Sequence, residues 1–191
     1  GSVSEAMTSP SQARASARGI GQVTYYFGED GFALKGLIKV DGKHYYLNDS
    51  YMRQTGWQIV GGRWYRFDET TGAAMSGWGD LPGGAGRRYL SPEGGYAVTG
   101  LQTIDNEKYY FDAAGVMQSG WRNVNSTWYC FDTETGKALK NQFAEDDGKV
   151  RYLGSDGAAV TGLLPLGTEI YFFDLEGVRT SGWQPVGTDL Y

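Results

Sequence analysis

From Val23 onward, apolar and polar residues alternate in short stretches, and the same order of stretches returns again and again along the chain. Each repeat has an apolar residue after a Gly, a polar turn, a short aromatic stretch, a second turn with Gly and a short apolar stretch. Residues 101–120 show this order most clearly. Alternation with a period of two predicts β-strands that bury one face. The pattern therefore predicts a succession of hairpins.

Every aromatic stretch is expected to end in a buried apolar residue. These strand ends are Phe27, Leu47, Phe67, Leu90, Phe111, Phe131, Leu153 and Phe173. The residue two positions earlier shares their face of the strand. Those partners are Tyr25, Tyr45, Tyr65, Arg88, Tyr109, Tyr129, Arg151 and Tyr171. We expect this nearly continuous aromatic and aliphatic stripe to form the interior.

One position closes every repeat with a Gly, except that Asn141 stands there once. The closing residues are Gly36, Gly56, Gly77, Gly100, Gly120, Asn141, Gly162 and Gly182. Gly and Asn take positive φ most readily, so we expect a left-handed backbone at this position. The residues that follow it are Leu37, Trp57, Trp78, Leu101, Trp121, Gln142, Leu163 and Trp183. Leu returns at every third repeat, which favours three hairpins per superhelical turn.

Single hairpins are marginally stable in water, so neighbouring hairpins must stack to bury the stripe. We therefore predict an all-β protein, a β-solenoid of stacked β-hairpin repeats with about three hairpins per superhelical turn. The array of about eight units is expected over residues 20–191, with its last unit truncated. Residues 1–19 are expected to be a tag remnant and a linker or capping segment, with an edge segment or a short helix over residues 11–18 as alternatives.

Composition narrows the functional classes. There are 17 Lys and Arg against 22 Asp and Glu, which leaves no electrostatic footprint for nucleic acid or anionic lipid. No stretch approaches the ~18 apolar residues of a membrane span, so membrane insertion is not expected. One His and one Cys cannot supply the usual zinc site, and Cys130 cannot form an internal disulfide. We predict no metal site and no cofactor.

Recurrent acids raise the question of catalysis. Carboxylate pairs hydrolyse glycosidic bonds, but here the acids occupy the same turn in many repeats. Asp and Asn are favoured turn openers, so we interpret these residues as scaffold. They are Asp68, Asp112, Asp132 and Asp174, with Asn48 in the same slot. His44 is expected at a surface or an edge, and no nucleophile has a suitable context. The chain is not expected to be an enzyme.

Two repeats have a sharper signature, in which a second Trp-Tyr dipeptide follows Gly-Trp at a fixed distance. The pairs are Trp57 with Trp64, and Trp121 with Trp128. This G-W-x6-W-Y pattern resembles the choline-binding repeats of Gram-positive surface proteins and cell-wall lytic enzymes. The Leu-type repeats, such as residues 99–121, look more like the glucan-binding repeats of glucansucrases and the repetitive C-terminal region of large clostridial toxins.

This resemblance implies ligand sites between successive hairpins, each made by two Trp of one hairpin and an aromatic ring of the next. It nominates Trp57 and Trp64 with Tyr89, and Trp121 and Trp128 with Tyr152, as ligand-binding residues. Trp78 and Trp183 occupy the first-Trp slot of other repeats and are nominated with them. Aromatic faces attract quaternary ammonium groups, and sugars can stack on them when polar groups lie nearby.

The sequence thus predicts a non-catalytic module, secreted and associated with a cell wall or cell surface. Its expected partner is a repetitive polymer, either choline-containing teichoic acid or a glucan or other glycan. The alternative is a structural spacer or a protein-interaction array that projects a neighbouring domain. A homodimer through the terminal hairpin is also considered, because the edge of an incomplete hairpin is unpaired.

Overall fold

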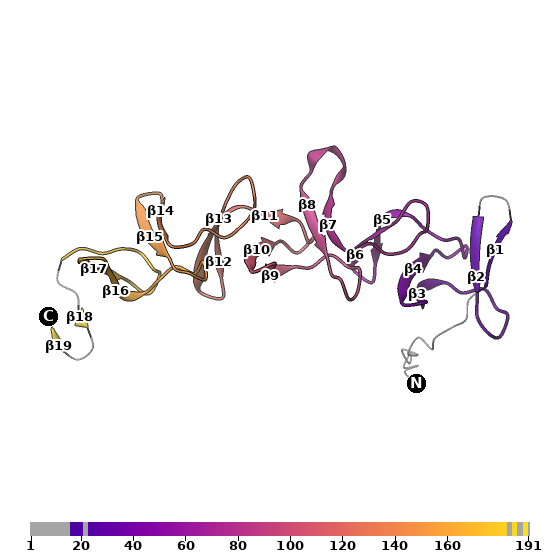
Figure 1. The fold of residues 1–191 in the computed structure, drawn as a ribbon, viewed down its shortest axis with the longest axis horizontal. Helices are drawn as coiled ribbons and strands as arrows, with labels where there is room; N and C mark the ends of the chain where they lie inside the picture. The colour runs from indigo at the N-terminus through magenta and orange to yellow at the C-terminus, as the bar shows by residue number, and fades with distance from the viewer. Residues whose placement is uncertain (1–15, 21–22, 183–184, 187–188, 191) are drawn as a thin grey trace, which may run out of the picture. The chain divides into compact units, whose positions relative to one another are not determined.

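The computed structural model describes residues 16–20, 23–182, 185–186 and 189–190. The chain divides into two compact units, residues 1–98 and 99–191. The described residues of both units form strands, turns and one short 3-10 helix. Figure 1 shows the strands, and this confirms the predicted all-β class. The part of the chain that the structure describes contains no helix with the length and apolarity needed to span a bilayer.

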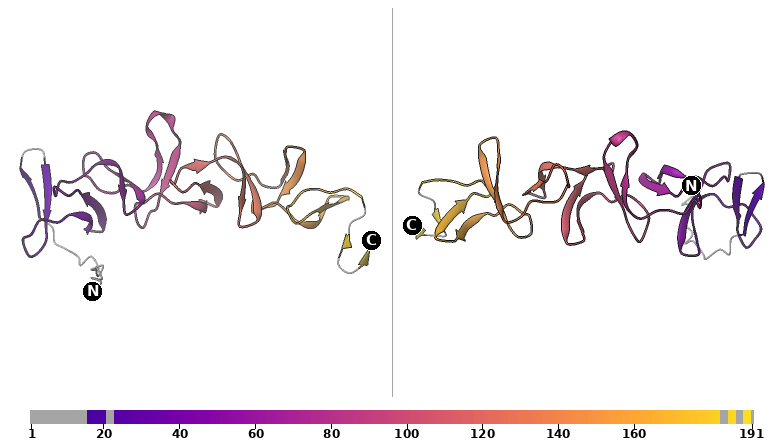
Figure 2. Two further views of the ribbon diagram at one scale, coloured as in Figure 1. Left: turned by 180° about the vertical axis from the view of Figure 1, so that it is seen from behind. Right: turned by 45° about the horizontal axis from the view of Figure 1, so that its top comes forward.

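The first unit consists of antiparallel hairpins, each formed by two consecutive strands (Figures 1 and 2). Its strands are β1 (Ser16–Ile20), β2 (Val23–Phe27), β3 (Gly36–Val40), β4 (Lys43–Leu47), β5 (Gly56–Val60), β6 (Arg63–Phe67), β7 (Gly77–Asp80) and β8 (Arg87–Leu90). The 3-10 helix η1 (Pro82–Gly84) lies in the long connection between β7 and β8. Residues 16–18 belong to a strand and not to the short helix considered above, whereas residues 1–15 lie outside the described part.

The second unit repeats the same construction. Its strands are β9 (Gly100–Ile104), β10 (Glu107–Phe111), β11 (Met117–Gln118), β12 (Gly120–Val124), β13 (Thr127–Phe131), β14 (Gln142–Asp146), β15 (Lys149–Leu153), β16 (Gly162–Leu166), β17 (Glu169–Phe173), β18 (Pro185–Val186) and β19 (Asp189–Leu190). Consecutive strands again pair antiparallel, and β11 adds a third strand beside β10.

Most hairpins are closed by two-residue turns with a left-handed backbone. Asp105 and Asn106 have φ of 51° and 63°, and Asn125 and Ser126 have φ of 51° and 66°. Positive φ at both positions defines the type I′ turn, whose twist matches that of the flanking strands. The short polar turns therefore fix the register of these hairpins.

The left-handed backbone predicted at the closing positions is confirmed, including Asn141 with φ of 53°. The register after Asn141 differs from the expectation, however. Gln142 pairs with Leu153, whereas the closing Gly itself pairs with the strand end elsewhere, as Gly120 does with Phe131. Phe143, and not Gln142, therefore occupies the first aromatic slot of this hairpin, because one extra residue separates the left-handed turn from the strand.

Neighbouring hairpins are joined by the segment that follows each second strand. In the second unit, the Leu139 amide donates to the Cys130 carbonyl of its own hairpin at 2.8 Å. The adjacent Ala138 amide donates to the Lys108 carbonyl of the preceding hairpin at 2.9 Å. In the first unit, Ala97 makes the corresponding bond to Trp64 at 2.7 Å. Each unit is thus a stack of hairpins, which confirms the predicted β-solenoid of repeats.

The interior is the stripe that the alternation predicted, except that Tyr25, Tyr45 and Tyr171 are only half-buried and that Tyr26 is buried in place of Tyr25. Of the eight strand ends, Phe27 is half-buried, and the others are at most 1% exposed. Tyr65, Tyr109 and Tyr129 are buried beside them. Both arginines of the stripe are buried as well, Arg88 with 5% and Arg151 with 1% exposure. A buried guanidinium requires strong compensation, and the source of that compensation lies at the Trp pairs.

Candidate functional site

The two Trp pairs form nearly identical corners of perpendicular rings. Trp57 on β5 lies opposite Arg66, and Trp64 is two residues from Arg66 on β6, so both indoles project from one face of the hairpin. Their centroids are 6.4 Å apart, with 79° between the planes. Trp121 and Trp128 on β12 and β13 repeat this at 6.4 Å and 74°. We call each pair an indole corner.

An arginine of the next hairpin fills each indole corner. The guanidinium carbon of Arg88, on β8, lies 4.3 Å from the Trp64 ring centroid and 5.0 Å from that of Trp57. Arg151, on β15, lies 4.7 Å from Trp128 and 5.1 Å from Trp121. In both units a buried cation therefore contacts two aromatic faces.

The tyrosines nominated as third rings lie elsewhere. Tyr89 contacts Trp78 across the β7–β8 hairpin, with centroids 5.2 Å apart and planes at 72°. Tyr152 contacts Phe143 at 5.1 Å and 73°. The structure thus brings the two Trp of each nominated site together, and it places Arg88 and Arg151, rather than the tyrosines, against them. Trp183 lies outside the described residues.

Small residues opposite the arginines make room for this arrangement. Gly79 pairs with Arg88, and Ala144 pairs with Arg151. A Cβ atom on Gly79 would lie 3.2 Å from Cζ2 of Trp57, so the indole packs directly on the backbone of the next hairpin. The Arg151 Nε also donates to the Glu176 carbonyl at 3.1 Å, which ties the guanidinium to the following turn.

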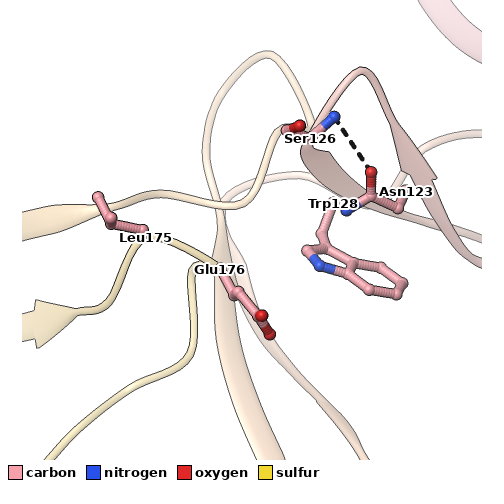
Figure 3. A pocket seen from close by; sticks show the side chains of 5 residues that line it. All are labelled: Asn123, Ser126, Trp128, Leu175 and Glu176. Carbon is pink, nitrogen blue, oxygen red and sulfur yellow. Dashed lines mark hydrogen bonds between the residues drawn. The ribbon is translucent and has the colours of Figure 1, made fainter.

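A hollow of about 270 Å³ opens beside Trp128 in the second unit (Figure 3). It is lined by Asn123, Ser126, Trp128, Leu175 and Glu176. The Asn123 Oδ1 accepts a hydrogen bond from the Ser126 amide at 3.1 Å, which holds the carboxamide at the turn. The hollow therefore combines an indole and an exposed aliphatic side chain with an amide, a hydroxyl and a carboxylate.

The outer ring pair of the first unit has polar neighbours too. The Arg87 guanidinium lies 4.8 Å from the Trp78 ring centroid, and its Nε is 2.8 Å from Asp80 Oδ1. Both Trp78 and Tyr89 are partly exposed. This surface offers rings flanked by a cation and a carboxylate.

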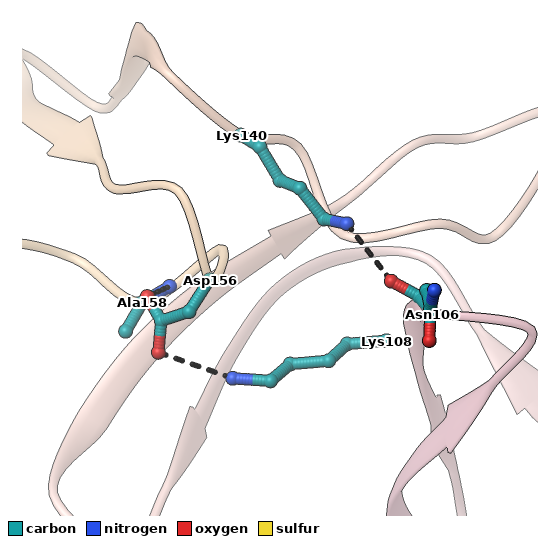
Figure 4. A network of polar contacts seen from close by, with 5 residues as sticks. All are labelled: Asn106, Lys108, Lys140, Asp156 and Ala158. Atoms are coloured by element: carbon teal, nitrogen blue, oxygen red, sulfur yellow. Dashed lines mark hydrogen bonds and ion pairs between the residues drawn. The ribbon is translucent and has the colours of Figure 1, made fainter.

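Where Lys108 replaces the second Trp, the junction is polar (Figure 4). Its Nζ lies 5.2 Å from the Tyr129 ring centroid and 3.2 Å from Asp156 Oδ2. Partial burial raises the pKa of Asp156, but hydrogen bonds from the Ala158 amide and Lys108 outweigh it and lower this pKa overall. Lys140 lies 2.6 Å from Glu107 and donates to the Asn106 carbonyl. The hydrogen bond from Lys140 lowers the pKa of Glu107.

The recurrent acids serve the turns, as the sequence predicted. Asp132 Oδ1 accepts hydrogen bonds from the Thr135 amide at 2.7 Å and the Thr135 hydroxyl at 2.8 Å, and Asp68 does the same with Thr71. Backbone hydrogen bonds from Thr135 and Thr71 lower the pKa of these two carboxyls. Among the described residues, no cluster of three or more His, Cys, Asp or Glu side chains could hold a metal ion.

Comparison with known proteins identifies the repeat. The family described as choline-binding repeat matches residues 34–78, 98–143 and 119–162, which together exceed half of the chain. The chain belongs to the choline-binding repeat family. This confirms the resemblance found in the sequence. The matched segments run from just before β3 into β7, and from just before β9 to the first residue of β16.

Relatives of this choline-binding repeat array include enzymes and toxins. Glucosyltransferase-I of Streptococcus downei is 31% identical over 172 residues, which cover 83% of this chain and 11% of that protein. Toxin A of Clostridium novyi is 33% identical over 137 residues, 69% of this chain and 5% of the toxin. The chain therefore spans about a tenth or less of these relatives. A solved structure of choline binding protein F from Streptococcus pneumoniae is 27% identical, with a TM-score of 0.60 over 86% of this chain and 57% of that one.

Proposed function

We propose that the chain is a non-catalytic module that binds a repetitive glycan polymer through partly exposed aromatic rings of its hairpins. The observation that supports this most directly is the hollow beside Trp128, where an indole meets the side chains of Asn123, Ser126 and Glu176. Sugars present an apolar face and a rim of hydroxyls, so their recognition requires a ring for stacking together with placed polar groups. The family and the glucosyltransferase relatives are consistent with this proposal.

Choline-containing teichoic acid is the second candidate partner. The choline-binding repeat match and the similarity to choline binding protein F favour it. Aromatic faces hold a quaternary ammonium without hydrogen bonds, at roughly 0.5 to 2 kcal/mol per ring depending on desolvation. The filled indole corners oppose it at those junctions, so glycan is preferred.

Several weak sites on one polymer would provide retention. A single stacking site binds weakly, but linked sites raise the effective concentration of the remaining ones. We propose that the module is extracellular and holds a larger protein on a cell wall or glycan, as the streptococcal and clostridial relatives suggest. A homodimer through residues 183–191 stays a prediction, because much of that segment lies outside the described residues.

Trp fluorescence titrations with dextran and other soluble glucans, run in parallel with choline, test this function. We expect saturable changes with a glucan and their loss in Trp128→Ala and Asn123→Ala, while Thr103→Ala, on the exposed face of β9, behaves as the wild type. If neither glucans nor choline change the Trp fluorescence while circular dichroism shows an intact fold, the result would contradict the proposal and favour the spacer alternative.

A further inference from the structure

Each of the two indole corners contains a buried arginine, which the proposed glycan binding does not explain. The same arrangement occurs independently in both compact units. In both cases the arginine comes from the next hairpin and is almost completely buried. Two occurrences of one geometry with matching distances indicate a built feature of the repeat and not a chance contact.

The chemistry of the corner explains why a cation lies there. An aromatic face attracts a positive charge within about 6 Å of its centroid, and desolvation strengthens this attraction. Two perpendicular faces converge on the guanidinium of Arg88 or Arg151, and in the first unit the Arg66 guanidinium also lies 5.7 Å from the Trp57 ring centroid. Arg151 Nη1 is buried and has no hydrogen-bond partner, so the ring faces supply much of the compensation for this group.

We propose that Arg88 and Arg151 are internal ligands of the indole corners, which closes both corners to external cations such as choline. Each guanidinium occupies the space in which the two rings would hold a quaternary ammonium. Each arginine therefore also holds two successive hairpins together, and we call this contact between an arginine and its Trp pair a lock. The arginines decide specificity at these junctions, since their removal leaves an unfilled two-Trp site.

This proposal goes beyond glycan binding and does not depend on it. Choline responses at Trp57 and Trp64 report on the first corner, which shares no residue with the hollow. Glucan responses report on the outer rings and on the hollow, which includes Trp128 of the second corner. If the expected choline response is not observed, the glucan response can still be measured in the same samples, and the reverse also holds.

The test follows the indole N–H signals of the full chain by NMR during titration with choline, using wild type, Arg88→Ala and Arg151→Ala. We expect the wild-type signals of the corner Trp to stay unchanged over a range in which the variants respond. Arg88→Ala should gain choline binding at Trp57 and Trp64 alone, at least about tenfold tighter than wild type. The Trp64 signal should change more than the Trp57 signal, because the Arg66 guanidinium still lies 5.7 Å from the Trp57 ring centroid. Arg151→Ala should do so at Trp121 and Trp128 alone.

Arg87→Ala is the matched control, because Arg87 is adjacent to Arg88 but partly exposed and paired with Asp80. It should leave the corner signals as in wild type. The proposal is overturned if the wild-type corners bind choline saturably and neither variant binds it more tightly.

A second measurement applies if Arg88→Ala or Arg151→Ala does not fold. Methylguanidinium, the missing group as a free molecule, is then titrated into the unfolded variant. Recovery of the native circular dichroism supports the internal-ligand role, and the absence of recovery at tens of millimolar contradicts it.

Discussion

At the scale of single residues, the structure depends on small side chains placed opposite large ones. Gly79 lies across from Arg88 and beneath Trp57, where even a Cβ atom would make a tight contact of 3.2 Å with the ring. Ala144 takes the same place opposite Arg151. The two hairpins that supply an arginine also share the order Arg-Tyr-Leu at their second strand, in residues 88–90 and 151–153. The sequence therefore contains a recognisable code for each lock.

Gly79→Val should displace Trp57 from its corner. The Cβ atom of the valine would lie 3.2 Å from Cζ2 of Trp57, and its methyl groups need further space. Either the indole or the backbone must therefore move. Overpacking of this kind costs about 1 to 3 kcal/mol. Urea denaturation followed by Trp fluorescence measures the loss, and an unchanged midpoint would show that Trp57 does not pack on this backbone.

Acid should weaken the turns that Asp68 and Asp132 support. Folding lowers the pKa of both carboxyls below their usual 3.8, because amide hydrogen bonds favour the charged form. Their contribution to stability is therefore present above pH 3.8 and is lost as the pH falls through the folded-state pKa. Denaturation of Asp68→Asn/Asp132→Asn should be less sensitive to acid than that of wild type.

Asn48 shows that an Asn can replace the Asp in this turn. Its Oδ1 accepts hydrogen bonds from the Ser50 and Met52 amides at the same position of its repeat, and its carboxamide does not titrate. Equal losses of stability between about pH 7 and pH 3 in both proteins would show that these two carboxylates are not responsible.

At the scale of the hairpin, turn geometry governs which substitutions are tolerated. Gly148 closes the β14–β15 turn with φ of 72° and open space around it, whereas Gly154 follows β15 without a positive φ and with ordinary contacts. Gly148→Ala should cost about 1 kcal/mol, because an L-residue is strained in this conformation. Gly154→Ala should be close to neutral. Thermal denaturation of both variants checks the difference, and equal melting temperatures would contradict it.

Hairpins and their interior could be predicted from the sequence, because the two-residue alternation is local and the strand ends are all apolar. The turn function of the acids followed from residue type. The slip at Asn141 could not be found by counting from the closing residue, although placing Phe143 opposite Tyr152 would have revealed it, as Trp78 lies opposite Tyr89. The arginine in each corner was missed for another reason. Arg88 and Arg151 were recognised in the interior stripe, but which rings they meet depends on contacts between hairpins.

At the scale of the whole molecule, the chain consists of two compact units that each contain one complete lock. Stability in stacked repeats is approximately a sum of each repeat and its contacts with its neighbours. We therefore expect residues 1–98 and residues 99–191 to fold as separate fragments. Near-ultraviolet circular dichroism measures this through the fixed environment of their aromatic rings. Fragments without such signals would show that the lock requires the intact chain.

The perpendicular indoles of each corner have a spectroscopic consequence. Two identical chromophores only 6.4 Å apart, in a fixed chiral arrangement, couple their electronic transitions, so their absorption splits into two bands of opposite rotational strength. The protein should therefore show a paired positive and negative signal in circular dichroism on top of the weak contribution of its strands. This exciton couplet would serve as a label-free reporter of the mutual orientation of the two indoles within each of these two hairpins.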